Sequence, residues 1–275
     1  MQTEKEANMY EEWPILPYHR KIQPHFLFII TPPFTGSTAL AQILNTSHRT
    51  MLLHPSGEGQ WIIPGLATLN REERWNPKRT MKYKSIRSVW LNKYQEIKRL
   101  VYNVDVVIEK SPPNMIHIEK YMKVFKNNSL LANNRNPYAY CASILYRNYN
   151  ISLMTREQRI KILQEIAFDW FRKSARVKKL TEKHRIPLLT YESICASPSS
   201  ILSKLKNMEN LPAGVADTID PNVPIKVKDY KTQKLADQNE RQLAKLKKKE
   251  IEILRNIFSK RNELLNFFGY SSEDI

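Results

Sequence analysis

One segment, residues 25–44 (HFLFIITPPFTGSTALAQIL), limits the possible folds of this chain more than any other. Its apolar beginning, Phe26–Thr31, is typical of a buried strand, which must end at Pro32 and Pro33. A short loop of small and hydroxyl residues follows, and apolar residues then recur at helical spacing. A strand, a loop and a helix in this order place free backbone N–H groups and a helix N-terminus around one point. The segment therefore predicts an anion site, with phosphate as its natural ligand.

Strand and helix patterns alternate along the rest of the chain. Short apolar runs predict strands at Phe26–Thr31, Thr50–His54, Val104–Glu109, Leu130–Asn133 and Pro187–Tyr191. Helical patterns lie between them, at Ser37–Asn45, Ser85–Leu100, Asn114–Phe125, Pro137–Arg147 and Arg159–Lys183. This alternation favours an α/β fold: a doubly wound, mainly parallel sheet of about five strands, flanked by helices and opened by a P-loop-like strand–loop–helix.

The length of 275 residues suits one α/β domain with a full core, so we expect a single domain over residues 1–275. Residues 1–24 are expected to form an irregular N-terminal arm. Residues 211–234 contain three prolines and few core residues, which predicts a long loop beside the site. A basic amphipathic helix near residues 238–265 is expected to close the chain.

The charge of the chain points to anionic partners. Lys and Arg number 44 against 27 Asp and Glu, a formal net charge of +17. Such a surface favours a polyphosphorylated cofactor, an acidic substrate, nucleic acid or an anionic membrane. No nucleic-acid-binding module is recognisable, and the aromatic residues do not interleave with the basic runs, so we expect no nucleic-acid partner. No apolar run approaches the ~20 residues of a bilayer span, and no leader is recognisable, which predicts a cytoplasmic protein without a membrane partner.

A second anion-binding pattern follows the fourth predicted strand. Arg135 stands at the end of that strand, and Asn136-Pro137 begins a helix, where proline is tolerated. Ser143 lies about two turns along this helix. A long Arg side chain lying along the helix can share one phosphate with the Ser hydroxyl, since Arg binds phosphate bidentately and Ser adds one donor. The chain thus offers two separate phosphate basins.

Four motifs in these positions resemble those of PAPS-dependent sulfotransferases, whose sulfuryl donor PAPS is 3′-phosphoadenosine 5′-phosphosulfate. They are PFTGST at residues 33–38, DVVIEKSP at 105–112, RNPYAYCAS at 135–143 and LLTYESICASP at 188–198. The resemblance extends over about residues 25–230. It implies an enzyme of the same fold that uses PAPS as co-substrate.

The resemblance also implies roles for individual residues. The first loop of the family holds the 5′-phosphosulfate, and its residues here are Thr35, Gly36, Ser37 and Thr38. The Arg and Ser of the second motif hold the 3′-phosphate, which corresponds to Arg135 and Ser143. The family's late Tyr, here Tyr191, lies near the adenine, and a catalytic-site lysine corresponds to Lys110. Family members close a basic loop over the nucleotide, which makes Lys226 and Lys228 candidates for the 3′-phosphate.

The chain also departs from the family pattern. Many members carry Lys or Arg in the first loop, where this chain has Phe34, so Lys110 is the best substitute. The His that serves as base in many small-molecule enzymes is missing from the run after the third strand. The turn Gly57-Glu58-Gly59 resembles the one that carries the base of tyrosylprotein sulfotransferases, which favours Glu58. The other candidate bases are His54, His117 and Glu109.

These features predict in-line sulfuryl transfer by positioning and charge stabilisation. Glu58 is expected to take a proton from the attacking group, and Lys110 with the helix N-terminus to stabilise the leaving phosphate. No metal-ligand cluster is visible in the sequence, and none is expected. The favoured acceptor is a hydroxyl or amine of a small molecule, with secondary metabolites such as alkaloid toxins among the candidates.

Other functions remain open at this point. A P-loop kinase or NTPase shares the strand–loop–helix, although the loop lacks the Gly-Lys-Ser/Thr ending that holds β- and γ-phosphates and Mg²⁺. A protein-tyrosine or carbohydrate sulfotransferase shares the other motifs. A nucleic-acid-binding protein is suggested by charge alone.

Overall fold

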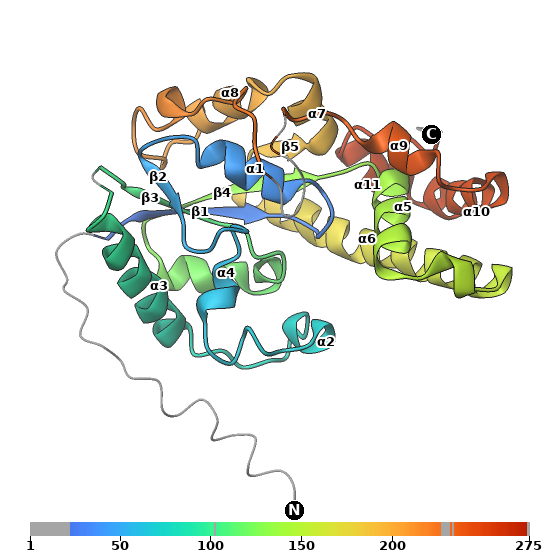
Figure 1. Ribbon diagram of the computed structural model, residues 1–275, viewed down its shortest axis with the longest axis horizontal. Coiled ribbons are helices and arrows are strands. Elements are labelled where there is room, and N and C mark those ends of the chain that lie inside the picture. Colours follow the sequence, from blue (N-terminus) through green and yellow to red (C-terminus); the bar gives the residue numbers. More distant parts are fainter. Residues whose placement is uncertain (1–22, 102, 227–231, 233, 274–275) are drawn as a thin grey trace, which may run out of the picture.

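The computed structural model describes residues 23–101, 103–226, 232 and 234–273 (Figure 1). It contains one five-stranded sheet in the order β2-β3-β1-β4-β5, and every neighbouring pair is parallel. The strands are β1 (His25–Ile30), β2 (Thr50–Leu52), β3 (Val106–Glu109), β4 (Asn128–Asn134) and β5 (Leu188–Thr190). All five expected strands are present, and the predicted α/β fold class is confirmed. The predicted arm at residues 1–24 lies almost entirely outside the described residues.

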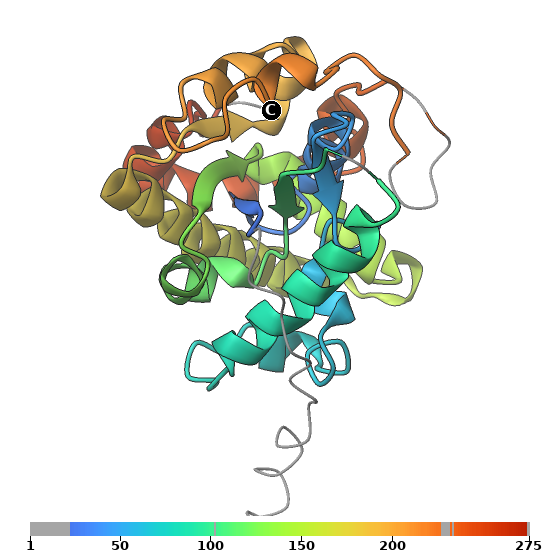
Figure 2. The same ribbon diagram turned by 90° about the vertical axis from the view of Figure 1, so that its left-hand side faces the viewer.

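Helices cover both faces of the sheet, as the turned view in Figure 2 also shows. One face carries α1 (Ser37–Leu44), α7 (Tyr191–Ala196) and α8 (Ser200–Lys206), and the other carries α3 (Tyr83–Lys98), α4 (Asn114–Val124) and α6 (Arg156–His184). Shorter segments join them: η2 (Gly59–Ile62), α2 (Arg71–Arg74), η3 (Ile151–Leu153) and η4 (Ala216–Thr218).

The central strand explains why the sheet is buried on both faces. Phe26 and Phe28 point to one face and pack against Trp90 of α3, while Leu27 and Ile29 point to the other and join the core under α1. Alternate residues of a strand face opposite sides, so a strand covered by helices on both sides must be apolar throughout. The first strand pattern of the sequence thus fixes two hydrophobic cores at once.

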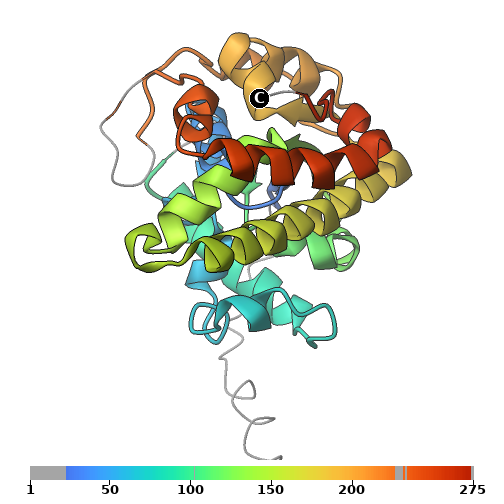
Figure 3. The same cartoon turned by 90° about the vertical axis from the view of Figure 1, so that its right-hand side faces the viewer.

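The C-terminal part differs from the single helix expected near residues 238–265. It contains α9 (Asn239–Leu243), α10 (Lys248–Phe258), η5 (Ser259–Arg261) and α11 (Asn262–Phe267). The carboxylate of Glu250 accepts the Lys247 N–H at 2.9 Å and pairs with Arg159 of α6 at 2.7 Å. This buried pair starts a new helix at Lys248 and lays α10 along α6, next to α5 (Pro137–Asn148) (Figure 3).

A buried histidine at the start of β1 predicts acid sensitivity of the fold. His25 is 7% exposed, its Nε2 lies 2.9 Å from Ser129 Oγ, and burial lowers its pKa from 6.5 to about 4 although Asp105 opposes this. Between these pH values the unfolded chain binds more protons at His25 than the native state does. The contribution of His25 to the free energy of unfolding is therefore complete above pH 6.5 and is lost as the pH falls towards 4. We expect His25 to contribute up to about 3 kcal/mol of this loss.

Urea denaturation of the wild type and of His25→Gln at steps between pH 7.5 and 4.5 measures this contribution. The variant should lose less unfolding free energy on acidification, because it has no group to protonate at this position. His117, whose pKa is also lowered to about 4, keeps its share in both proteins. An equal pH dependence of the two proteins would contradict the prediction.

Candidate functional site

A cavity of about 410 Å³ lies at the carboxyl ends of the strands. The loop after β1, the turn before η2, the residues after β3 and β4, and the start of α7 all contribute to its lining. This is the edge at which parallel α/β sheets bind ligands. Six of the side chains in its lining are basic and one, Glu58, is acidic. The cavity is therefore electropositive, as a site for a polyanion must be.

The loop after β1 is held in shape by buried hydroxyl and amide groups. Thr35 is fully buried and donates to the Pro32 carbonyl at 2.8 Å, while its own carbonyl accepts Asn133 Nδ2 at 2.9 Å. Its hydroxyl also lies 2.6 Å from that of Thr31. Thr35 was expected to contact the anion, but its side chain does not belong to the cavity lining. Thr35 instead holds the conformation of the loop through these hydrogen bonds.

The next residues form the anion cradle itself. Gly36 has φ +75°, and a Cβ at this position would overlap the ring of Tyr191, so both conformation and space require glycine. Gly36, Ser37 and Thr38 line the cavity at the start of α1. No side chain caps this helix, and its first turn contains no acid. The N–H groups and the positive end of the helix dipole are therefore available to an anion.

Lys110 and Glu58 meet beside this cradle. The Lys110 ammonium donates to Thr38 Oγ1 at 3.0 Å and to Glu58 Oε1 at 2.8 Å. The Lys110 side chain is only 2% exposed, and that of Glu58 is 16% exposed. Gln60 Nε2 donates to the second Glu58 oxygen at 2.7 Å. The two residues expected to perform chemistry thus form an ion pair against the anion loop.

The other candidate bases lie elsewhere. Glu109 is buried and accepts hydrogen bonds from three protein donors, and His117 is buried in α4 with a pKa lowered by burial and by nearby Arg79 and Lys120. His54 Nδ1 lies 2.8 Å from Ser56 Oγ. None of the three candidates lines the cavity, whereas Glu58 does. Their positions favour Glu58 as the base.

Arg135 carries the clearest sign of a missing ligand. Its Nε donates to Asn239 Oδ1 at 2.8 Å, its Nη1 donates to the Phe34 carbonyl at 3.2 Å, and the guanidinium lies 4.4 Å from the Tyr191 ring centroid. Its Nη2 is buried and has no hydrogen-bond partner among the described residues. A buried N–H left unpaired costs about 1–3 kcal/mol, and more for a charged group. Such an atom in a cavity lining indicates an anion site.

Ser143 and Tyr191 also line this cavity. Ser143 is half-buried on α5, as expected for a second phosphate donor. The Tyr191 hydroxyl donates to the Ala236 carbonyl at 2.9 Å and accepts the Gln238 N–H at 3.2 Å. Tyr191 therefore contacts the Gly36 turn, the Arg135 guanidinium and the segment before α9, and holds the three together.

A hydrogen-bonded relay leads away from Arg135 through its partner Asn239. Asn239 Nδ2 donates to Glu192 Oε1 at 2.6 Å, and the same oxygen accepts the Asn136 N–H at 2.9 Å. The other oxygen of Glu192 accepts the Tyr270 hydroxyl at 2.8 Å. The relay connects β4, α7, α9 and the segment after α11.

Four basic residues of the lining were missed by the sequence reasoning: Arg147, Lys234, Arg241 and Lys245. Arg147 follows Ser143 by four positions on α5, a spacing that places side chains on one helix face, whereas Lys245 follows Arg241 by four but lies just beyond the end of α9. This spacing was the available signal. Lys226, which was expected here, is exposed and is not among the lining residues, and Lys228 lies outside the described residues.

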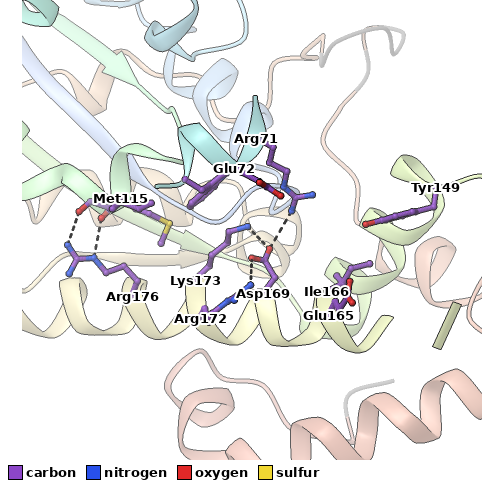
Figure 4. A pocket seen from close by; sticks show the side chains of 12 residues that line it. Arg71, Glu72, Met115, Tyr149, Glu165, Ile166, Asp169, Arg172, Lys173 and Arg176 are labelled. Atoms are coloured by element: carbon purple, nitrogen blue, oxygen red, sulfur yellow. Dashed lines mark hydrogen bonds and ion pairs between the residues drawn. The ribbon is translucent and has the colours of Figure 1, made fainter. Parts of the chain in front are cut away.

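A second cavity of about 530 Å³ lies between α2, α4 and α6 (Figure 4). Asp169 forms ion pairs with Arg71, Arg172 and Lys173, and Arg176 donates to the Met115 carbonyl at 3.2 Å. Its main charged groups thus have partners within the protein, and no residue expected at the site lines it. The cavity at the strand ends is therefore the candidate site.

Clusters of metal ligands and membrane-spanning helices are both absent from the part of the chain that the structure describes. No group of three His, Cys, Asp or Glu side chains is arranged to hold a metal ion. None of the described helices combines the length and the apolar character that crossing a bilayer requires.

Comparisons with known proteins agree with this geometry. A family model described as "Sulfotransferase family" matches residues 24–213. The sulfotransferase STF9 from Mycobacterium avium superposes with a TM-score of 0.52 at 14% identity, covering 93% of this chain and 78% of its own. The sulfotransferase domain from the curacin biosynthetic pathway gives 0.48 at 17% identity, covering 86% and 99%. The STF9 likeness shows a shared fold. No curated protein matches in sequence.

Proposed function

Because this chain belongs to the sulfotransferase family, whose model covers more than half of its length, we propose that it transfers the sulfuryl group of PAPS to a hydroxyl or amine of a small-molecule acceptor. The observation that carries the choice of donor is the buried, unpaired Nη2 of Arg135 beside an uncapped helix N-terminus. Two anion receptors in one electropositive cavity suit a nucleotide that carries phosphate groups at both ends.

The residues of the cavity divide between the two ends of such a donor. The Gly36–Thr38 turn and Lys110 would hold the 5′-phosphosulfate, since they converge on one another. Arg135 and Ser143 would hold the 3′-phosphate, with Arg241 and Lys245 of the same lining as further cations. Tyr191 packs between the Gly36 turn and the Arg135 guanidinium, and its ring would lie near the adenine.

The chemistry then follows from the Lys110–Glu58 pair. The acceptor oxygen or nitrogen attacks sulfur in line, the bond from sulfur to the bridging phosphate oxygen breaks, and Glu58 takes the proton of the attacking group. Lys110 and the N–H groups of the α1 terminus stabilise the negative charge that develops on the leaving phosphate. The products are the sulfated acceptor and 3′-phosphoadenosine 5′-phosphate. Secondary metabolites are among the acceptors we propose, and a cytoplasmic location would suit them.

Incubation with PAPS and a panel of phenols, alcohols, amines and guanidinium alkaloids tests this function. We expect acceptor-dependent release of 3′-phosphoadenosine 5′-phosphate with at least one acceptor class. ATP with Mg²⁺ should give no transfer, because the loop has no lysine of the kinase type. Absence of any calorimetric binding of 3′-phosphoadenosine 5′-phosphate would overturn the proposal.

A further inference from the structure

The acid next to Lys110 in sequence has no role in the mechanism above, although it is almost completely buried. Glu109 is 1% exposed and is not among the residues that line the cavity. Resting on the proposed function, we propose that Glu109 is a positioning residue that clamps the Glu58 turn to the Lys110 turn and thereby sets the distance between base and lysine. It would act through these two residues without touching the substrate.

The contacts of Glu109 reach both halves of the pair. Its Oε2 accepts the Gly59 N–H at 2.7 Å, and Gly59 directly follows Glu58. Its Oε1 accepts the Ser111 N–H at 2.8 Å, and Ser111 directly follows Lys110. One carboxylate therefore joins the two backbone turns that carry the ion pair. A further bond from the Lys110 N–H to the Gly57 carbonyl, at 2.8 Å, closes the same junction from the other side.

The junction leaves no room for adjustment at Gly59. A Cβ at this position would lie 2.5 Å from Glu109 Oε2 and 3.0 Å from Trp90 Nε1, which donates to the Gly59 carbonyl at 3.0 Å. The φ of Gly59 lies outside the left-handed region, so backbone conformation does not require glycine here. The requirement comes from the approach of Glu109 and Trp90, which fixes the turn on both its N–H and its carbonyl.

The third partner of Glu109 shows which protonation state the junction needs. Asn114 Nδ2 donates to Oε1 at 2.9 Å, so three N–H groups donate to the carboxyl, and the Ser111 hydroxyl is a further hydrogen-bond partner that stabilises its charged form. A protonated carboxyl would have to turn its own O–H towards one of these donors and lose that hydrogen bond. The carboxylate form therefore holds the clamp closed.

Charged and titratable neighbours surround this group on each packed element. Glu58 lies before η2, Lys110 follows Glu109 at the end of β3, and Tyr121 lies on α4. Burial raises the pKa of Glu109 to about 7, while its hydrogen bonds act in the opposite direction. We expect the clamp to open, and turnover to fall, as pH drops below about 7.

The test is the variant Glu109→Gln, which keeps the shape but offers one acceptor oxygen. That oxygen can accept hydrogen bonds either from Ser111 and Asn114 or from Gly59. One of the two turns therefore loses its hydrogen bond to residue 109. We expect kcat to fall by about 10- to 100-fold, because a displacement on the order of 1 Å has effects of this size. The affinity for 3′-phosphoadenosine 5′-phosphate should stay within about threefold, which corresponds to less than 1 kcal/mol. The decrease in activity below pH 7 should disappear.

Two further variants separate positioning from folding. Asn114→Asp added to Glu109→Gln gives the Gln Nε2 an acceptor, so the Gln oxygen can return to Gly59. The Ser111 N–H still has no acceptor, so kcat should recover only in part. Gly59→Ala pushes on the clamp from the opposite side and should reproduce the loss of kcat with the acid still present. Glu72→Gln, in the other cavity, is the matched control and should retain wild-type kcat.

The outcomes distinguish this inference from the proposed function. If Glu109→Gln lowers kcat and nucleotide affinity alike, or lowers neither, the positioning role is wrong. If the wild type transfers nothing from PAPS, the proposed function fails, and a crystal structure of Glu109→Gln decides on the clamp by itself. A Glu58–Lys110 separation that stays at the 2.8 Å of the wild type would then overturn the inference, and a longer one would support it.

Discussion

Replacing Arg135 with alanine will weaken the binding of 3′-phosphoadenosine 5′-phosphate by about 100-fold or more. The guanidinium offers a buried Nη2 without a partner, and its position is fixed by Asn239, Phe34 and Tyr191 before any ligand arrives. Each charge-assisted hydrogen bond to phosphate contributes about 1.5–3 kcal/mol, so two of them account for a change of this size. Titration calorimetry with the purified variant measures it.

Two companion variants define what the Arg135 experiment reports. Arg135→Lys keeps the charge but loses the planar fork, so its affinity should lie between those of the wild type and the alanine variant. Arg172→Ala removes an exposed guanidinium beside the other cavity and should leave the affinity unchanged. Equal losses in Arg135→Ala and Arg172→Ala would mean that the nucleotide feels only the overall charge of the protein.

Replacing Glu58 with glutamine will lower kcat by about 10²- to 10⁴-fold, the contribution that general bases usually make. Binding of 3′-phosphoadenosine 5′-phosphate should remain within about threefold, because the amide can still accept the hydrogen bond of Lys110 and no phosphate receptor is removed. Rapid-quench measurement of a single turnover with PAPS separates the chemical step from product release. Normal turnover in this variant would show that another group takes the proton.

The partner variant Lys110→Met tests whether the pair acts as a unit. Lys110 is almost fully buried, and its ammonium contacts both the loop and the base. Residues that act together are strongly non-additive, so the double variant should be little slower than the worse single one. Simple multiplication of the two losses would indicate that Glu58 and Lys110 act at separate steps.

The sheet could be predicted well because each strand is encoded by a short, local run of residues. A strand covered on both faces must be apolar at every position, and the five runs satisfy this condition between turn residues. The convergence of three candidate residues on one cavity could be predicted for a related reason. In a parallel sheet the residues after each strand meet at one edge, so Gly36, Lys110 and Arg135 converge without any knowledge of side-chain packing.

The features that the sequence patterns did not predict depend on partners that are distant in sequence. The expected helix at residues 238–265 is interrupted because Glu250 pairs with Arg159, and its periodicity contains no trace of that contact. Lys226 was a candidate for the 3′-phosphate because the family resemblance implies a basic loop over the nucleotide, and in the structure it is exposed and outside the lining. Arg241 of α9 and Lys245 just after it belong to the lining, and the bond from Arg135 to Asn239, more than a hundred residues away in sequence, ties α9 to this site. Local patterns cannot anticipate such long-range pairs.

The relay from Tyr270 through Glu192 and Asn239 to Arg135 has an evolutionary consequence. Its members come from four separated parts of the chain, yet each orients the next by a hydrogen bond. A substitution at Tyr270 would therefore be felt as altered donor affinity, far from any contact with the donor. We therefore expect these four positions to covary. Relatives that bind the same nucleotide should either keep all four residues or have substitutions at several of them together.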